Sequence, residues 1–155
     1  MKRKAFLSTL FFLFCCQFLT AQNCPPGTFI NGIQCTPCAA GTYQPNRNLT
    51  KCLACPTGTA QAQTGQTSCN NCPAGTFQSE RGQITCIACP AGTFQSLTTQ
   101  PNCISCAPGN VQPNEGQTSC FGCSPGSQPN ADQTTCEPCP AGTFDNGSAC
   151  VPCAA

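Results

Sequence analysis

The sequence predicts a small disulfide-rich repeat protein, an elongated ladder of short β-hairpins and turns with little helix outside an N-terminal leader and no large hydrophobic core. Three observations predict this fold class. Cysteine accounts for 19 of the 155 residues, a density typical of disulfide scaffolds. Large apolar side chains are too few to offset roughly 1–2 kcal/mol of backbone entropy per ordered residue. The cysteines also recur at a nearly constant spacing, which is typical of repeat proteins.

Residues 1–21 have the three parts of a secretory signal peptide. A cationic start, MKRK, precedes the apolar run AFLSTLFFLFCCQFL, and a small residue stands at Ala21. This order predicts cleavage after Ala21. The run is shorter than the about 20 apolar residues of a spanning helix, and no second run follows it. We therefore expect a mature chain without a membrane span, secreted or located at the cell surface.

The charged residues after the leader are few and scattered. Residues 22–155 contain three cationic and five acidic side chains, a net charge of 3 − 5 = −2, so the basic surface of a nucleic-acid binder is missing. His is absent and the acids lie in different repeats, which argues against general acid–base catalysis. We expect no enzyme and no catalytic, cofactor-binding or metal-binding residue. The charged residues are Arg47, Lys51, Arg81, Glu80, Glu115, Asp132, Glu137 and Asp145.

The cysteines after the leader form one single residue and eight C-x-x-C pairs. The step between pairs is 17 residues five times running and then shortens to 16 and 14. The spacing predicts about eight tandem units over residues 22–153, each too small to bury a core alone. The single residue is Cys24, and the pairs are Cys35/Cys38, Cys52/Cys55, Cys69/Cys72, Cys86/Cys89, Cys103/Cys106, Cys120/Cys123, Cys136/Cys139 and Cys150/Cys153.

A turn motif follows the second cysteine of each pair. Its clearest copies read Cys-Pro-Ala-Gly-Thr-Phe from Cys72, Cys89 and Cys139. Proline fixes φ near −65° and glycine supplies a positive φ, so the chain reverses just after the cysteine. A second turn precedes the next cysteine, as in residues 64–69. Each unit is therefore expected to be a two-limbed loop, with the aromatic ring packed within it or, alternatively, exposed as part of a ladder for a ligand.

The order of the single cysteine and the C-x-x-C pairs along the chain predicts the disulfides. If the second cysteine of each pair bonds the first cysteine of the next pair, sixteen of the seventeen cysteines after the leader are used. Each loop contributes roughly 3 kcal/mol by restricting the unfolded chain. The predicted bridges are Cys24–Cys35, Cys38–Cys52, Cys55–Cys69, Cys72–Cys86, Cys89–Cys103, Cys106–Cys120, Cys123–Cys136 and Cys139–Cys150.

Other uses of the cysteines stay open. Adjacent pairs can interleave, or each C-x-x-C can close on itself, although the latter constrains little of the chain. Cys52, Cys55, Cys69 and Cys72 have a spacing close to that of a zinc ribbon. Export favours disulfides over metal.

The sequential pairing leaves Cys153 unpaired. Ala154 and Ala155 match the residues after Cys38, so residues 154–155 are interpreted as the start of a further unit and the chain as a fragment. Asn48-Leu49-Thr50 and Asn146-Gly147-Ser148 are sequons, and we expect glycans at Asn48 and Asn146 in a host that uses them.

The repeated C-x-x-C-P-x-G-T-[FY] motif resembles the cysteine-rich repeat of ephrin-receptor-like domains. It is also similar to tumour necrosis factor receptor modules and to repeat surface antigens of protists and some bacteria. The resemblance covers residues 24–153 and implies a disulfide-laddered rod of short hairpins that acts by display and protein contact. It also implies the sequential disulfide pairing. Residues 38–40, 106–108 and 123–125 depart from the Cys-Pro opening.

A non-catalytic extracellular role follows as the expectation. The near-uniform units favour a surface stalk, spacer or structural display module, because a binding site would make one unit distinct. The alternative is the ligand-binding ectodomain fragment of a receptor or adhesin that engages a protein partner. Either role implies protein or cell-surface partners.

Overall fold

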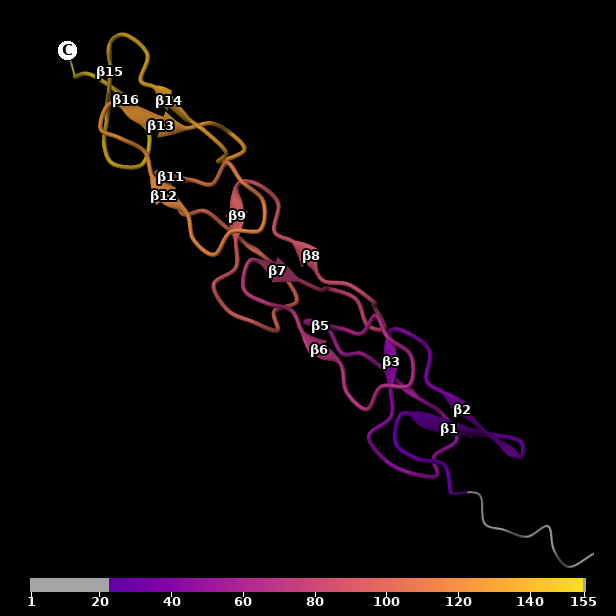
Figure 1. Ribbon diagram of the computed structural model, residues 1–155. Coiled ribbons are helices and arrows are strands. Elements are labelled where there is room, and N and C mark those ends of the chain that lie inside the picture. Colours follow the sequence, from indigo (N-terminus) through magenta and orange to yellow (C-terminus); the bar gives the residue numbers. More distant parts are fainter. Residues whose placement is uncertain (1–22, 155) are drawn as a thin grey trace, which may run out of the picture.

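A computed structural model of the protein describes residues 23–154, which form a rod of hairpins that follow one another along its length (Figure 1). The predicted signal peptide, residues 1–21, lies outside the described residues. Within residues 23–154 the regular structure consists of short strands, without helix. The predicted fold class, a disulfide-rich ladder of short hairpins, is confirmed.

Each hairpin pairs two consecutive strands in antiparallel orientation, and the described chain contains eight such two-stranded sheets. The strands are two to four residues long and lie on either side of the second turn of each unit. Their bounds are β1 Thr28–Asn31, β2 Gln34–Pro37, β3 Thr42–Tyr43, β4 Leu53–Ala54, β5 Thr59–Ala60, β6 Asn70–Asn71, β7 Thr76–Phe77, β8 Ile87–Ala88, β9 Thr93–Phe94, β10 Ile104–Ser105, β11 Asn110–Val111, β12 Phe121–Gly122, β13 Ser127–Pro129, β14 Cys136–Pro138, β15 Thr143–Asp145 and β16 Cys150–Pro152.

A disulfide closes each hairpin, and we number the resulting loops 1 to 8 in chain order. The sequence separation of the bonded cysteines is 14 residues in loops 2 to 6, 13 in loop 7 and 11 in loops 1 and 8. Eight disulfides in series therefore run along the described chain. The loops are closed by Cys24–Cys35, Cys38–Cys52, Cys55–Cys69, Cys72–Cys86, Cys89–Cys103, Cys106–Cys120, Cys123–Cys136 and Cys139–Cys150.

The first turn of each unit ends in a glycine, within a Pro-x-Gly motif in loops 1, 3, 4, 5 and 8, as loop 4 illustrates. The amide of Thr76 donates a hydrogen bond of 3.1 Å to the carbonyl of Pro73, and the Thr76 hydroxyl donates to the same oxygen at 2.7 Å. Gly75 has a φ of 83°, a value that side chains with a Cβ rarely adopt. The motif thus reverses the chain directly before β7, which explains its recurrence.

The second turn also has a left-handed residue at a fixed place. These residues are 17 positions apart and have φ values from 55° to 76°. Asparagine and glycine tolerate this conformation, whereas threonine is β-branched and strained there. The positions are Asn48, Gly65, Gly82, Thr99, Gly116 and Gln133.

The strain at Thr99, whose φ is 62°, makes a testable prediction. Replacing Thr99 by glycine is expected to raise stability by about 0.5–1 kcal/mol. The left-handed conformation costs a residue with a Cβ about 1–2 kcal/mol. Part of the gain from removing this cost is lost, because glycine has a larger conformational entropy in the unfolded chain. The measurement is thermal unfolding of the oxidised protein. The control is Thr98→Gly, next to it in the same turn; an equal or larger gain there would contradict the assignment.

The interior of the rod is a column of sulfur and polar groups. The second cysteines of the first five pairs and Cys24 are buried, and Ala60 and Val111 complete the buried apolar side chains among the described residues. Burial decreases toward loop 8, where Cys139 is half-buried and Gly142 exposed. The covalent ladder therefore takes the place of an apolar core.

Loops three apart in the sequence return to the same side of the rod. In Figure 1, β2, β8 and β14 of loops 1, 4 and 7 lie along one edge, and β6 and β12 of loops 3 and 6 lie along the opposite edge. Successive loops are therefore rotated relative to one another, and equivalent residues form three columns along the rod.

Candidate functional site

The loops of the array interlock through a repeated set of main-chain hydrogen bonds. Between loops 4 and 5, the amide of Gly75 donates to the carbonyl of Gln95 at 2.7 Å, and the amide of Gln78 donates to Gln100 at 3.1 Å. The amide of Thr99 donates back to the carbonyl of Cys72 at 2.8 Å. Equivalent residues make the same three bonds at every junction from loop 1 to loop 6.

In loops 1 to 6 the glycine of the first turn also approaches the loop after the next. A Cβ built on Gly75 of loop 4 would collide with the carbonyl oxygen of Gly116 in loop 6. Gly41 stands in the same relation to Gly82, and Gly27 to Gly65. Glycine is required at these positions for close packing as well as for its positive φ. The loops are thus tied to both their nearest and their next-nearest neighbours.

A buried glutamine follows the aromatic position in loops 2 to 6. Its Nε2 donates to the carbonyl seven residues later at 2.7–3.0 Å. Its Oε1 accepts from the amide two residues later at 3.0–3.1 Å. The amide therefore bridges both limbs of its own loop in place of backbone pairing. These side chains are Gln44, Gln61, Gln78, Gln95 and Gln112, exposed by 1–5%.

Sequence reasoning missed these glutamines, because glutamine is usually a surface residue. The signal that identifies them is their spacing: each follows the aromatic position, and the five recur every 17 residues. Loops 1, 7 and 8 have Ile30, Pro129 and Asp145 at this position. The five loops with the glutamine are also the five whose disulfides span 14 residues.

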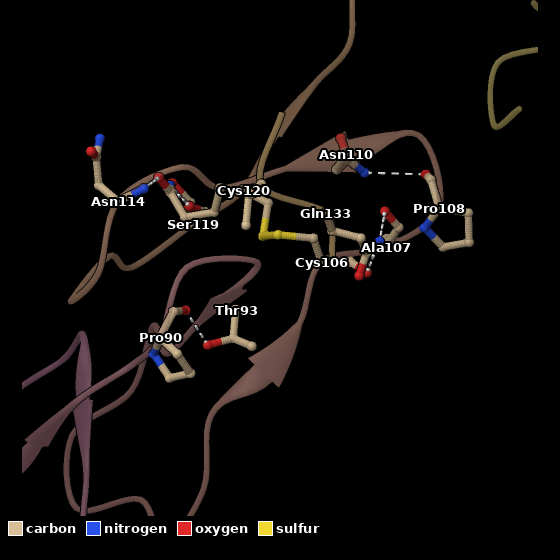
Figure 2. The surroundings of a disulfide bond; sticks show 12 residues. Pro90, Thr93, Cys106, Ala107, Pro108, Asn110, Asn114, Ser119, Cys120 and Gln133 are labelled. Atoms are coloured by element: carbon tan, nitrogen blue, oxygen red, sulfur yellow. Dashed lines mark hydrogen bonds between the residues drawn. A yellow bond between two sulfur atoms is a disulfide. The ribbon is translucent and has the colours of Figure 1, made fainter. Parts of the chain in front are cut away.

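A side chain replaces a main-chain contact at the junction of loops 6 and 7. Loop 7 is one residue shorter than loop 6, and Gln133 occupies the left-handed position. Figure 2 shows its side chain beside Cys106, with Nε2 donating to the carbonyls of Cys106 at 2.8 Å and Ala107 at 3.3 Å. At the next junction the amide of Cys150 donates to Oε1 of Gln128 at 2.8 Å. Side chains thus continue the stacking where the repeat shortens.

The structure places the predicted cysteines in sequential pairs and leaves Cys153 free and exposed. The amide of Cys153 donates to the carbonyl of Gly142. The four cysteines with zinc-ribbon-like spacing are distributed over three disulfides. Over residues 23–154, no cluster of three or more His, Cys, Asp or Glu side chains is arranged to hold a metal ion.

The two sequons differ in their surroundings. Asn48 is exposed at the left-handed place of loop 2, and its main-chain amide donates to the carbonyl of Cys24 at 3.2 Å. The side-chain oxygen of Asn146 accepts hydrogen bonds of 3.0 Å from the amides of Ser148 and Ala149. Glycosylation of either asparagine stays a prediction. The geometry leaves Asn48 exposed and engages Asn146 in its own turn.

The comparisons with known proteins agree with this geometry. A profile of the family described as "Tyrosine-protein kinase ephrin type A/B receptor-like" matches residues 27–68 and 58–99. No curated protein matches the chain. No helix among the described residues is long and apolar enough to cross a membrane. The family match indicates an extracellular receptor-type module of a non-catalytic kind. Residues 27–99 therefore contain ephrin-receptor-like cysteine-rich repeats.

Proposed function

We propose that this chain is a non-catalytic extracellular spacer, a stalk that holds whatever is attached to it at a set distance from a surface. The observation that carries the proposal is the repeated set of three main-chain hydrogen bonds at each junction from loop 1 to loop 6. These bonds, together with the glycine contacts to the next-nearest loop, fix the orientation of each unit relative to its neighbours. An array built this way resists bending at each junction from loop 1 to loop 6.

The local character of the contacts supports the same role. Each loop contacts loops one and two places away, so stability and length add up unit by unit. The disulfides close short loops, each of which removes roughly 3 kcal/mol of unfolded-state entropy at this loop size. A unit can therefore be added or removed without loss of a shared core, which suits a spacer whose length is set by its number of repeats.

The test is a pair of deletions that each remove one complete unit. Deleting residues 72–88 removes the Cys72–Cys86 bridge, and deleting residues 89–105 removes the Cys89–Cys103 bridge, with every other bridge kept. Small-angle scattering of the secreted protein is expected to show both deletions shortening the rod by the same increment. A flexible chain would respond only as the square root of its length. A radius of gyration near about 14 Å, the value for a globular domain of this size, would refute the spacer.

The ligand-binding alternative makes a different prediction. A receptor or adhesin ectodomain captures one protein partner through one unit, so deleting that unit abolishes capture and deleting a different unit leaves it intact. A spacer shows no such difference between units. A screen in which a specific protein binds through a single loop would favour the receptor function.

A further inference from the structure

One side of the rod carries an apolar face that no contact within the chain covers. The interlocking hydrogen bonds are the same at each junction from loop 1 to loop 6, so each loop is related to the next by nearly the same rotation. Loops 1, 4 and 7 share one side, and loops 3 and 6 share another (Figure 1). In the same view β3, β9 and β15 of loops 2, 5 and 8 lie in a line between these two edges, so these loops form the third side. We name it the 2-5-8 face; it consists of the hairpins β3–β4, β9–β10 and β15–β16.

An aromatic ring faces an aliphatic side chain in every hairpin of the 2-5-8 face. The registers pair Tyr43 with Leu53, Phe94 with Ile104, and Phe144 with Val151. Cross-strand pairs of this kind form a continuous apolar surface on a hairpin.

The other two sides interrupt this pattern with polar pairs. On the side of loops 1, 4 and 7, the register pairs Phe29 with Thr36 and Gln128 with Glu137. On the side of loops 3 and 6, Ala60 faces Asn70. Apolar pairing in all hairpins of a side is therefore specific to the 2-5-8 face among the described residues.

The apolar pairs remain accessible to a partner. Leu53 is 41% exposed, Ile104 50% and Phe144 51%. Leu49 and Leu97, at 41% and 62%, lie in loops 2 and 5. Five of the nine exposed large apolar side chains of the described chain thus belong to these three loops. Exposed apolar side chains that recur along one side of a molecule make that side a candidate interaction surface.

The charges of the 2-5-8 face have opposite signs at its two ends. Loop 2 carries Arg47 and Lys51, loop 5 carries no charged residue, and loop 8 carries Asp145. Arg47 and Lys51 are exposed, and Asp145 is half-buried. Two such faces complement each other when they run in opposite directions, because loop 2 of each chain then meets loop 8 of the other. Parallel alignment places like charges together.

We propose that the 2-5-8 face binds a second copy of this chain to form an antiparallel dimer. A twofold axis passes near loop 5, so that the Phe94/Ile104 pairs of the two chains pack together and Asp145 of each chain meets Arg47 and Lys51 of the other. A twofold interface is self-complementary in this way. Apolar burial drives the association, and the charges select the antiparallel direction. This dimer is a proposal separate from the spacer function. A rod that stays monomeric would refute the dimer and leave the spacer proposal standing.

The experiment compares one position on two sides of the rod. Sedimentation of the secreted protein with Cys153 alkylated is expected to show a concentration-dependent dimer. Ile104→Glu should weaken the dimer by about tenfold or more, because it buries a charge at the centre of the apolar contact. Ile87→Glu is the matched control: Ile87 has the same place in loop 4 and is 49% exposed, but lies on another side. It should leave the dimer unchanged.

Charge exchange tests the antiparallel direction. Asp145→Lys, and separately Arg47→Glu with Lys51→Glu, should each weaken the dimer, whereas the triple variant should restore it and make it sensitive to salt. A wild-type protein that stays monomeric at high concentration would overturn the proposal. So would an equal effect of Ile87→Glu and Ile104→Glu. A dimer that Asp145→Lys leaves unchanged would overturn its antiparallel arrangement.

Discussion

Replacing Gly75 by alanine is expected to destabilise the oxidised protein by about 2–5 kcal/mol. The left-handed conformation of Gly75, with φ 83°, costs a residue with a Cβ about 1–2 kcal/mol. The new methyl group would also collide with the carbonyl oxygen of Gly116, two loops away. Because this neighbour is backbone, the stack must shift to relieve the overlap, which adds roughly 1–3 kcal/mol. Thermal unfolding with the disulfides intact measures the loss.

Gly142→Ala is the matched control for this prediction. Gly142 has the same place in its motif and a φ of 82°, but no atom lies within 4 Å of a Cβ built there. Its substitution should therefore cost only the conformational term of about 1–2 kcal/mol. Equal losses for the two variants would show that the packing between loops 4 and 6 contributes nothing to stability.

Replacing Gln78 by leucine is expected to cost about 2–4 kcal/mol, although leucine is similar in size. Gln78 is 3% exposed. Its Nε2 donates to the carbonyl of Thr85 at 2.8 Å, and its Oε1 accepts from the amide of Glu80 at 3.0 Å. Leucine leaves both main-chain groups without a partner, and because these groups are only part-buried, each loss lies at the lower end of about 1–3 kcal/mol. Thermal unfolding measures the loss, and hydrogen exchange at Glu80 locates it.

Gln117→Leu serves as the control, because Gln117 is exposed and its Nε2 donates only to the carbonyl of Glu115 within the same surface turn. A surface substitution of this kind changes stability by no more than about 0.5 kcal/mol. If the two glutamine variants unfold at the same temperature, the buried amides are not structural.

The sequence predicted the units of the rod but not the way in which they interlock. Cysteine spacing and the Pro-x-Gly turn are local signals, and they were sufficient for the two-limbed loops because each turn is made by neighbouring residues. From the sequence, Gly75 is expected only to supply a positive φ, whereas its packing against Gly116 depends on the rotation between loops. That rotation is set by hydrogen bonds between loops and has no local signature. The 2-5-8 face could not be predicted for the same reason.

The buried glutamines show a different limit of sequence reasoning. No expectation drawn from the sequence singled out the glutamines, although Gln78 lies in the interior. A polar side chain is stable there only because both halves of its amide find main-chain partners in its own loop. Recurrence at a fixed place in the repeat was the available signal. Composition alone does not distinguish these buried glutamines from glutamines on the surface.

The pairing of the cysteines is the central claim, because every loop, junction and face described above depends on it. A protease that cleaves next to Phe, Leu and Ile, applied under non-reducing conditions, separates the members of a C-x-x-C pair at Ile87 and at Ile104. Mass spectrometry of the fragments is expected to link Cys72 to Cys86 and Cys89 to Cys103, with Cys153 as the alkylated cysteine. A fragment that links Cys86 to Cys89, or Cys72 to Cys89, would contradict the ladder.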